Sequence, residues 1–297
     1  MRLKHATVLI TGGSSGIGLE LARQLLARDN TVIIVGRRQA ALDAAQAELP
    51  DVHIAACDVS RPEAVAALYT ELADAFPALN VLINCAGLMR RVDLRAELDP
   101  GELTSEIDVN LKGAMWMTAR FLPLFNTQAE AAIVNVTSDL AYVPMAVAPV
   151  YSASKAGLHA YTRALRAQLV GSRVEVFEVA PPATATPLRE GFAGDRGPAP
   201  LCAETVARAA IAGIERGAVE TAVGPAGLLR LLGRLAPRFA FARVNDAATS
   251  RMAAERIGDR RPARDDRPLW TRVEPHLELD HRRPVSCGVS HRTAVLA

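Results

Sequence analysis

Residues 7–18 read TVLITGGSSGIG, a short run with β-branched residues that leads directly into a glycine-rich turn. The residues from Ile17 to Ala27 then repeat their apolar positions with the spacing of a helix. A glycine turn between a strand and a helix is a setting in which backbone N–H groups and the helix dipole can hold a phosphate. This stretch therefore predicts the start of a nucleotide-binding α/β fold.

The glycines of this turn have separate expected uses. Gly12 permits a tight turn, Gly16 lets the backbone approach a pyrophosphate, and Gly18 lets the helix pack close to the sheet. The turn lacks a following Lys-Ser or Lys-Thr pair, so it does not match a nucleoside-triphosphate P-loop. The alternative is a turn that only joins strand to helix. The other residues of the turn that we expect to bind the cofactor are Ser14, Ser15 and Ile17.

Strand-like runs and helical segments alternate along the chain up to the run that ends at Val179. Such alternation predicts parallel strands joined by right-handed crossovers, with helices on both faces. We therefore expect a single α/β domain with a doubly wound parallel sheet, a Rossmann fold. The expected strands are 7–10, 31–35, 53–56, 81–84, 132–137 and 174–179, and the clearest later helices are 39–49 and 62–76.

We expect residues 1–245 to form this domain. Residues 181–200, rich in Pro, Gly and Thr, break the rhythm after the sixth strand and are a candidate substrate loop or lid. Residues 246–297 are rich in Arg, Asp and Pro and show no sustained period, so we expect a mostly disordered C-terminal tail.

The composition argues against several classes of protein. The 297 residues carry a net charge of only +2 and 4% aromatic residues, so we expect no nucleic-acid partner. No apolar run reaches the roughly 18 residues needed to cross a bilayer, and the N-terminal run is too short for a signal peptide. We therefore expect a cytoplasmic protein. Four cysteines lie far apart without a histidine at ligand spacing, and we expect no metal.

The residues after the second expected strand bear on the choice of coenzyme. An acidic residue at this place would accept hydrogen bonds from a ribose 2′-hydroxyl, but the sequence has Arg37 and Arg38. A guanidinium can pair with a 2′-phosphate, so we expect NADP(H) to be favoured over NAD(H). Alternatively, the two arginines are a solvated helix start. After the third strand, Asp58, followed by Val59, could accept from an adenine amino group or cap the helix that begins near Pro62.

A second motif, YSASK from Tyr151 to Lys155, opens a helical segment. Residues four apart share one helix face, and an ammonium near a phenol favours the phenolate. Ser138, 13 residues before Tyr151 at the end of a strand, is placed to donate to a substrate oxygen. An isolated YxxxK pair is common by chance. Its position after a strand that ends in serine gives it weight.

The order of these motifs between Thr7 and Leu188 resembles the short-chain dehydrogenase/reductase family. Its dinucleotide motif TGxxxGxG is matched by Thr11 to Gly18. Its NNAG motif, which supports the central sheet and the adenosine side, appears as Asn84-Cys85-Ala86-Gly87. The resemblance implies that Asn84, Ala86 and Gly87 lie at the cofactor.

The same resemblance implies a catalytic tetrad of Asn110, Ser138, Tyr151 and Lys155. Tyr151 would donate or accept the substrate proton, and Lys155 would lower its pKa and bind the nicotinamide ribose. Ser138 would orient the reacting oxygen, and Asn110 would hold a water in a proton relay.

One segment departs from the family. Residues 181–187 read PPATATP, where the family commonly has Pro-Gly followed by an aliphatic residue and Thr. Pro182 fixes its backbone φ and removes a donor near the nicotinamide. The resemblance still places Pro181, Thr184 and Thr186 among the cofactor-binding residues. Other details, such as the AlaProPro that ends at Pro182, are similar to the DltE-like branch of bacterial oxidoreductases.

We therefore expect an NADP(H)-dependent oxidoreductase that interconverts a carbonyl and a secondary alcohol, with Tyr151 as general acid and base. The alternatives are a catalytically silent NADP(H)-sensing regulator, or an epimerase or dehydratase on the same fold. Residues 139–150, which include Val143, Pro144, Met145 and Val147, could line an apolar substrate pocket or simply pack against the lid or another subunit.

Two further segments bear on partners. Apolar residues in 110–125 and 151–169, a pair of helices that associate between subunits in the family, predict a homodimer or homotetramer; the alternative is a monomer in which they face the sheet. These residues are Met115, Trp116, Leu158, Tyr161 and Leu165. The basic amphipathic stretch 227–244 could touch a membrane, but covering the pocket or a subunit is favoured.

Overall fold

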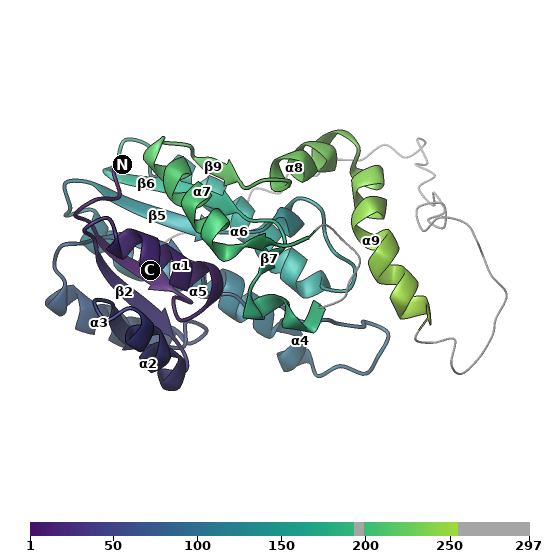
Figure 1. The fold of residues 1–297 in the computed structure, drawn as a ribbon, viewed down its shortest axis with the longest axis horizontal. Helices are drawn as coiled ribbons and strands as arrows, with labels where there is room; N and C mark the ends of the chain where they lie inside the picture. The colour runs from purple at the N-terminus through teal and green to yellow at the C-terminus, as the bar shows by residue number, and fades with distance from the viewer. Residues whose placement is uncertain (193–198, 255–297) are drawn as a thin grey trace, which may run out of the picture. The chain divides into compact units, whose positions relative to one another are not determined.

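The computed structural model describes residues 1–192 and 199–254; residues 193–198 and 255–297 lie outside the described part. Its centre is a seven-stranded parallel sheet in the order β3-β2-β1-β4-β5-β6-β9 (Figure 1). The strand order reverses between β1 and β4, which confirms the expected doubly wound sheet. The strands are β1 (Thr7–Thr11), β2 (Thr31–Gly36), β3 (His53–Ala56), β4 (Leu79–Asn84), β5 (Ala131–Val136), β6 (Val174–Ala180) and β9 (Glu220–Ala222).

Helices cover both faces of this sheet, as Figure 1 shows. Side chains alternate along each strand, so Val8 and Ile10 of β1 pack in one apolar cluster and Leu9 packs in the other. The first cluster takes in helices α1 (Gly16–Leu26), α2 (Gln39–Glu48) and α7 (Ala203–Glu215). The second takes in α3 (Pro62–Ala75), α5 (Gly113–Phe125) and α6 (Pro149–Gln168).

A π-helical turn interrupts the helix that leads into α5. Helix α4 (Pro100–Ile107) has Asp99 as its N-cap, and the Asp99 side chain accepts from the backbone N of Glu102. The helix runs into the π turn η1 (Asp108–Lys112). A π turn adds a residue to the helical register and is frequent at functional sites. Here it contains Asn110, whose side chain is 1% exposed.

The segment after β6 has more regular structure than the sequence predicts. The expected loop 181–200 contains β7 (Thr184–Ala185) and a 3₁₀ helix η3 (Pro187–Phe192), and β7 pairs in parallel with β8 (Leu201–Cys202). The seventh sheet strand, β9, is also absent from the sequence-based expectation. It has only three residues, Glu-Thr-Ala, which are too few to show an alternating or continuous apolar pattern.

The basic amphipathic stretch forms two helices, α8 (Ala226–Leu235) and α9 (Pro237–Ala254), which Figure 1 shows following β9. Helix α9 crosses the expected domain boundary at residue 245, so the expected tail begins inside a helix. The side chain of Asn245 accepts from Ala146 N at 2.6 Å and donates to Pro144 O at 3.0 Å, which fixes α9 to the loop before α6. Residues 255–297 lie outside the described part.

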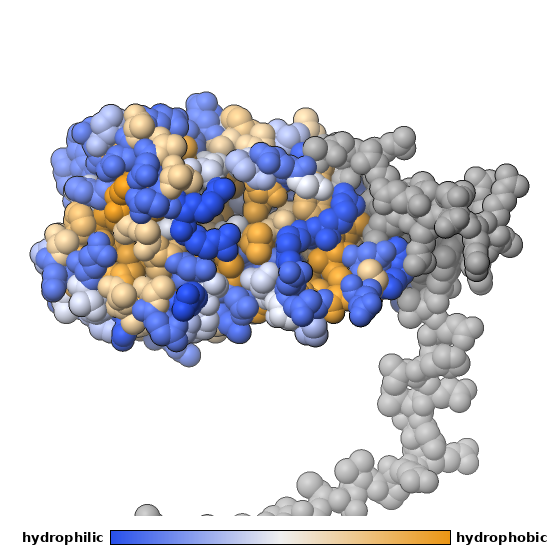
Figure 2. Space-filling model, turned by 90° about the horizontal axis from the view of Figure 1, so that it is seen from below, coloured by the Kyte–Doolittle hydropathy of each residue, from blue (hydrophilic) through white to orange (hydrophobic). Residues whose placement is uncertain are grey.

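The surface in Figure 2 mixes charged and apolar residues, with blue and orange interleaved over the face shown. In the described part of the chain, no helix is long and apolar enough to span a bilayer. Leu158 and Leu165, on which the oligomer expectation partly rests, are buried within the chain at 1% and 7% exposure. Trp116 and Tyr161 pack against the second apolar cluster. These four side chains therefore contact their own core.

Candidate active site

A cleft lies along the carboxyl ends of the sheet strands and joins the two sequence motifs. Its wall includes the glycine turn after β1 at one part and Tyr151 and Lys155 of α6 at another. Ligands of open α/β sheets bind in this position, where the strand order reverses. The expected residues on the wall are Gly12, Ser14, Ser15, Gly16, Ile17, Gly18, Arg37, Arg38, Asp58, Val59, Ala86, Gly87, Tyr151, Lys155, Pro181 and Thr186.

The glycine turn has a shape that side chains would fill. Gly12 and Gly16 have φ values of +68° and +56°, in the left-handed region that favours glycine. A Cβ on Gly12 would lie 2.7 Å from Ala86 Cα, and a Cβ on Gly16 would lie 2.9 Å from Thr186 Cγ2. The hydroxyl of Thr11 accepts from the backbone N of Cys85 and Ala86, both at 3.1 Å, and holds the turn against β4.

This turn fits a dinucleotide phosphate. Ser15 precedes α1, and within the described residues its side chain makes no capping hydrogen bond, so the first N–H groups of the helix remain available to an anion. Thr11 was part of the motif but absent from the expected site residues. Its role could have been inferred from the rule that a backbone N–H at a sheet edge needs a partner.

The residues after β2 and β3 lie on the same wall. Arg37 and Arg38 are exposed there, and Arg38 also occupies the N-cap position of α2, so the pair both starts a helix and borders the cleft. Asp58 accepts from Ser60 N at 3.0 Å and from Ser60 Oγ at 2.6 Å. The cap position of α3 is Arg61. The structure therefore rules out Asp58 as the residue that caps α3.

Tyr151 and Lys155 are buried side by side on α6. The Lys155 Nζ atom lies 5.8 Å from the centre of the Tyr151 ring and donates to Val136 O at 2.8 Å. Burial lowers the pKa of Lys155 to about 8. Burial also raises the pKa of Tyr151 well above its ordinary value, and a hydrogen bond with Ser138 opposes this shift. Tyr151 therefore holds its proton at neutral pH.

Ser138 has a neighbour that the motif does not predict. Its hydroxyl donates to Asp139 Oδ1 at 3.0 Å and accepts from Leu140 N at 3.2 Å. Burial raises the pKa of Asp139 to about 6, against the opposing effect of the Ser138 hydrogen bond. The charge of Asp139 in turn raises the pKa of Tyr151. Asp139 therefore accepts a hydrogen bond from Ser138 and also affects the pKa of Tyr151.

Four expected residues, Ser138 among them, do not line the wall of the cleft. Asn110 Oδ1 accepts from Leu88 N at 2.7 Å, and its Nδ2 donates to Leu88 O and to Ser154 Oγ, each at 2.9 Å. Asn84 is buried and donates to Asn135 Oδ1 at 2.9 Å. Thr184 is 7% exposed and donates to Pro182 O at 2.8 Å. Their side chains brace the loops and strands that form the cleft.

Tyr151 belongs to a small apolar cluster. It contains the buried residues Val147, Ala148 and Phe192, packed with partly buried neighbours. Phe192 comes from η3, so the segment after β6 contributes to this cluster. Residues of the loop 139–150 pack in two places: some belong to this cluster, whereas Val143 lies against Gly233 of α8. The partly buried members are Met89, Leu140 and Met145.

Comparison with known proteins agrees with this geometry. The profile of the short chain dehydrogenase family matches residues 6–196, which is more than half of the chain. The chain belongs to the short-chain dehydrogenases. It is therefore an NAD(P)-dependent oxidoreductase of that family, as the order of its motifs predicts.

The relatives place this dehydrogenase in a DltE-like group. It is 45% identical to the uncharacterized oxidoreductase DltE of Bacillus subtilis over 191 residues, which cover 64% of this chain and 76% of DltE. It is 38% identical to sulfoacetaldehyde reductase 2 of Chromohalobacter salexigens over 178 residues, 59% of this chain and 71% of the relative.

A solved structure with a similar fold is a short chain dehydrogenase from Burkholderia cenocepacia in complex with NADP. It has a TM-score of 0.72 and 28% identity, and the match covers 82% of this chain and 99% of the other. A 3-ketoacyl-(acyl-carrier-protein) reductase from Brucella melitensis complexed with NADH has a TM-score of 0.69 and 26% identity, with 74% and 97% covered.

Proposed function

We propose that this dehydrogenase uses NADP(H) to interconvert a carbonyl and a secondary alcohol, with Tyr151 transferring the proton. The observation that carries the proposal is the joint placement of the Tyr151–Lys155 pair and the glycine turn on the wall of one cleft. A dinucleotide that follows this wall would reach from the turn to the pair. The residues at the turn fit its phosphates, as described above.

The residues around Tyr151 suit proton donation to a carbonyl oxygen. NADPH, when bound, supplies the hydride. The raised pKa of Tyr151 keeps the phenol protonated at neutral pH, which is the form that donates when a carbonyl is reduced. Lys155, buried 5.8 Å from the ring centre, stabilises the phenolate that this donation leaves. The Ser138 hydroxyl orients the reacting oxygen.

The preference for NADP(H) rests on Arg37 and Arg38. Both are exposed on the cleft wall directly after β2, where a guanidinium can pair with a 2′-phosphate. The Burkholderia relative binds NADP and the Brucella relative binds NADH, so the choice varies among similar folds. We expect Arg37→Ala to weaken NADPH binding about tenfold or more and to leave NADH binding nearly unchanged. Equal losses for both coenzymes would remove the 2′-phosphate assignment.

A carbonyl substrate agrees with the names of two relatives, sulfoacetaldehyde reductase 2 and the ketoacyl reductase HetN of Nostoc, which is 35% identical over 183 residues, 60% of this chain and 63% of HetN. The partly buried members of the apolar cluster at Tyr151, which are Met89, Leu140 and Met145, favour a substrate with an apolar portion next to the reacting carbon.

The decisive experiment is a panel of aldehydes, ketones and secondary alcohols tested with NADPH or NADP⁺. We expect Tyr151→Phe to lower kcat by about a hundredfold or more, with NADPH affinity retained. Tyr161→Phe is the matched control, because Tyr161 lies on the same helix and packs against the core. Turnover that survives Tyr151→Phe would exclude Tyr151 as the proton donor.

A further inference from the structure

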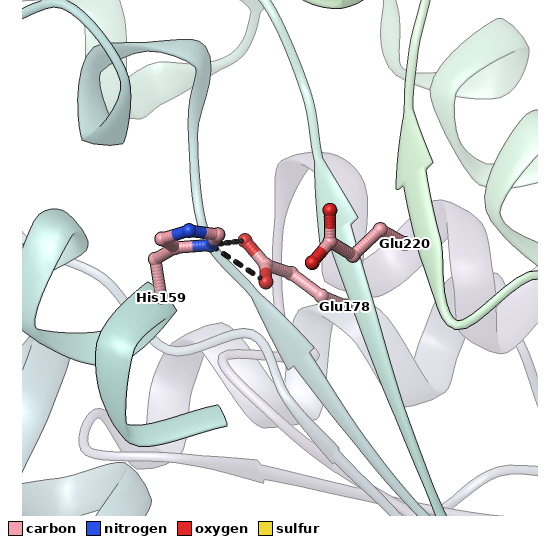
Figure 3. Close-up of side chains that lie close together, drawn as sticks. All are labelled: His159, Glu178 and Glu220. Carbon is pink, nitrogen blue, oxygen red and sulfur yellow. Dashed lines mark hydrogen bonds and ion pairs between the residues drawn. The ribbon is translucent and has the colours of Figure 1, made fainter. Parts of the chain in front are cut away.

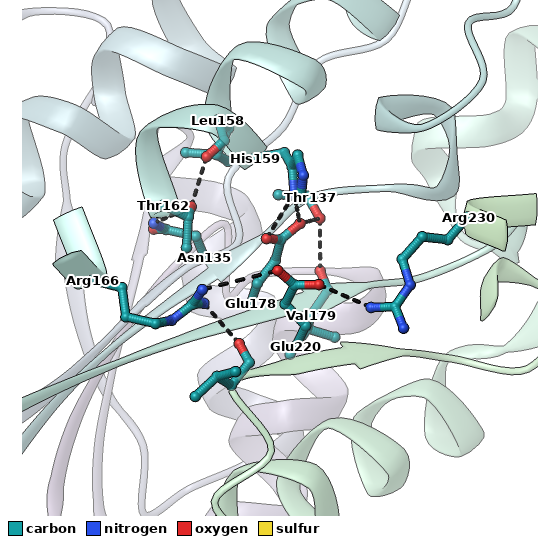
Figure 4. A network of polar contacts seen from close by, with 11 residues as sticks. Asn135, Thr137, Leu158, His159, Thr162, Arg166, Glu178, Val179, Glu220 and Arg230 are labelled. Carbon is teal, nitrogen blue, oxygen red and sulfur yellow. Dashed lines mark hydrogen bonds and ion pairs between the residues drawn. The ribbon is translucent and has the colours of Figure 1, made fainter. Parts of the chain in front are cut away.

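Glu178 is a buried carboxylate that the proposed mechanism does not use. It lies on β6 and is 1% exposed. A carboxylate loses its hydration when buried, so it is retained only where other groups replace the lost hydrogen bonds. In Figures 3 and 4 the side chain of Glu178 meets His159 of α6. The Nδ1 atom of His159 lies 2.9 Å from each Glu178 oxygen.

The second partner of Glu178 is Thr137, which connects it to the proton-transfer site. The Thr137 hydroxyl donates to Glu178 Oε1 at 2.8 Å, as Figure 4 shows. Thr137 is the residue directly before Ser138, and it lies on the cleft wall. The His159–Glu178–Thr137 chain therefore runs from α6, through β6, to the residue next to Ser138.

Helix α6 is thus fastened to the end of β5 at two successive turns. Lys155 Nζ donates to Val136 O at 2.8 Å, and His159, four residues later, reaches Thr137 through Glu178. Tyr151 is four residues before Lys155, so all three side chains come from successive turns of the same helix. The two links set how the helix that carries Tyr151 sits against the strand end that carries Ser138.

A different reading of this cluster is a cation site, because atoms of His159, Glu178 and Glu220 all lie within 4.8 Å of one another. The surrounding charges disfavour it. Arg230 Nη1 is 2.8 Å from Glu220 Oε2, and Arg166 Nη1 is 3.9 Å from Glu220 Oε1 (Figure 4). A dication would have to displace these guanidinium groups from Glu220. Glu220 therefore belongs to an outer ion-pair layer that does not contact Thr137.

We propose that Glu178 and His159 are positioning residues, which act through Thr137 to hold Ser138 at its working distance from Tyr151. The inference rests on the proposed function, because only in that function does the distance between Ser138 and Tyr151 affect catalysis. It assigns no proton-transfer step to Glu178 or His159. The contacts that carry it are the paired 2.9 Å distances to His159 and the 2.8 Å bond from Thr137.

The test compares Thr137→Val, Glu178→Gln, their double variant and the control Glu220→Gln. Thr137→Val replaces the hydroxyl by a methyl group, which removes its bonds to Glu178 and to Val179 O and keeps the Glu178–His159 contact. It therefore carries the test even where Glu178→Gln fails to fold. We expect Thr137→Val and Glu178→Gln each to lower kcat by about tenfold to a hundredfold, with NADPH affinity unchanged. The losses in the double variant should not add, because both changes break one chain of contacts. Glu220→Gln should lower Tm and leave kcat unchanged.

A structural readout needs no substrate and separates this inference from the proposed function. In crystal structures of Thr137→Val and Glu178→Gln, we expect the Ser138 and Tyr151 oxygens to shift relative to each other by about half an ångström or more. Glu220→Gln should retain the wild-type separation. An unchanged separation in folded Thr137→Val, or an equal loss of kcat in Glu220→Gln, would overturn the positioning role. Wild-type protein without turnover on the panel would reject the proposed function alone.

Discussion

Lys155 contacts both Tyr151 and the end of β5: its Nζ lies 5.8 Å from the centre of the Tyr151 ring and donates a hydrogen bond to Val136 O. We expect Lys155→Met to lower kcat by about a hundredfold, since the methionine keeps the length of the side chain and removes the ammonium. Arg163→Met is a suitable control, because Arg163 is an exposed residue of the same helix. Steady-state kinetics on the same carbonyl substrate check this.

The buried amine of Lys155 also predicts how stability depends on pH. Its folded-state pKa of about 8 lies below the ordinary value of 10.5, so the folded state disfavours the ammonium. This cost is complete below pH 8 and disappears as pH rises through the ordinary value. Lys155→Met should therefore gain stability relative to wild type at pH 7 and lose most of that gain by about pH 11. Urea unfolding at both pH values measures it, and a gain that stays constant would contradict the assignment.

Asp139 predicts a pH effect on activity. Its pKa of about 6 means that it is ionised at neutral pH, where its charge raises the pKa of Tyr151. Asp139→Asn removes that charge and should shift the ascending limb of alcohol oxidation, which needs the phenolate, to lower pH. The measurement is kcat/KM for oxidation against pH, with Asp108→Asn of the exposed Lys112 pair as control. A limb that stays in place would show that Asp139 does not act on Tyr151.

Burial of Asp139 should make stability fall as pH rises, whereas burial of Lys155 should make it rise with pH. A carboxyl whose folded-state pKa is raised disfavours its ionised form in the fold, so wild type should lose stability as pH rises from about 4 to above 6. Asp139→Asn should remove this part of the pH dependence. Thermal unfolding of both proteins across that range tests the sign.

Gly16 offers a steric test of the cofactor site. Gly16→Ala would place a Cβ 2.9 Å from Thr186 Cγ2 at a φ of +56°, so we expect weaker NADPH binding with the fold retained. Thr186→Ser removes the Cγ2 atom and should restore part of the affinity in the double variant. Gly217→Ala, at a φ of +71° and with no heavy atom of the described residues within 4 Å, is the matched control. Fluorescence titration with NADPH measures each affinity.

A homodimer or homotetramer stays a prediction from the family resemblance. Exposed apolar residues now point to helices α8 and α9, where Leu228, Leu235 and Phe239 are 61%, 75% and 58% exposed. If these helices form the contact, Leu235→Glu should shift the mass measured by light scattering towards the monomer. The control is Leu94→Glu, because Leu94 is 62% exposed but lies outside these two helices. It should leave the mass unchanged.

The local motifs were predictable because each is short and has its own chemistry. The residues of the glycine turn are close together in the sequence, and so are Tyr151 and Lys155, so each motif can be recognised there. A parallel sheet then brings the ends of its strands, and with them both motifs, to one edge. The six longer strands follow from apolar runs. Strand β9 could not be predicted, because its three residues carry no such pattern. The π turn at Asn110 could not be predicted either, because a change of hydrogen-bond register in a helix leaves no pattern in the amino-acid sequence.

The supporting residues could not be predicted, because distance along the chain hides their contacts. His159 and Glu178 are 19 positions apart and meet only when α6 packs on β6. Asp139 is one residue from Ser138, but its raised pKa arises from burial that the completed fold provides. The sequence therefore indicates the chemistry of the site, and the three-dimensional packing decides how each group titrates and what holds it.

The exposure of Arg37 and Arg38 has a practical consequence for anyone who wishes to re-engineer this protein. They stand at the solvent-facing rim, whereas Tyr151, Lys155 and Glu178 are enclosed. Exchanging the rim pair for an acid and a small residue disturbs no packed side chain. If Arg37 and Arg38 select the coenzyme as proposed, the coenzyme preference can be changed by substitutions at the surface, whereas changing the proposed proton-transfer residues requires redesign of the interior.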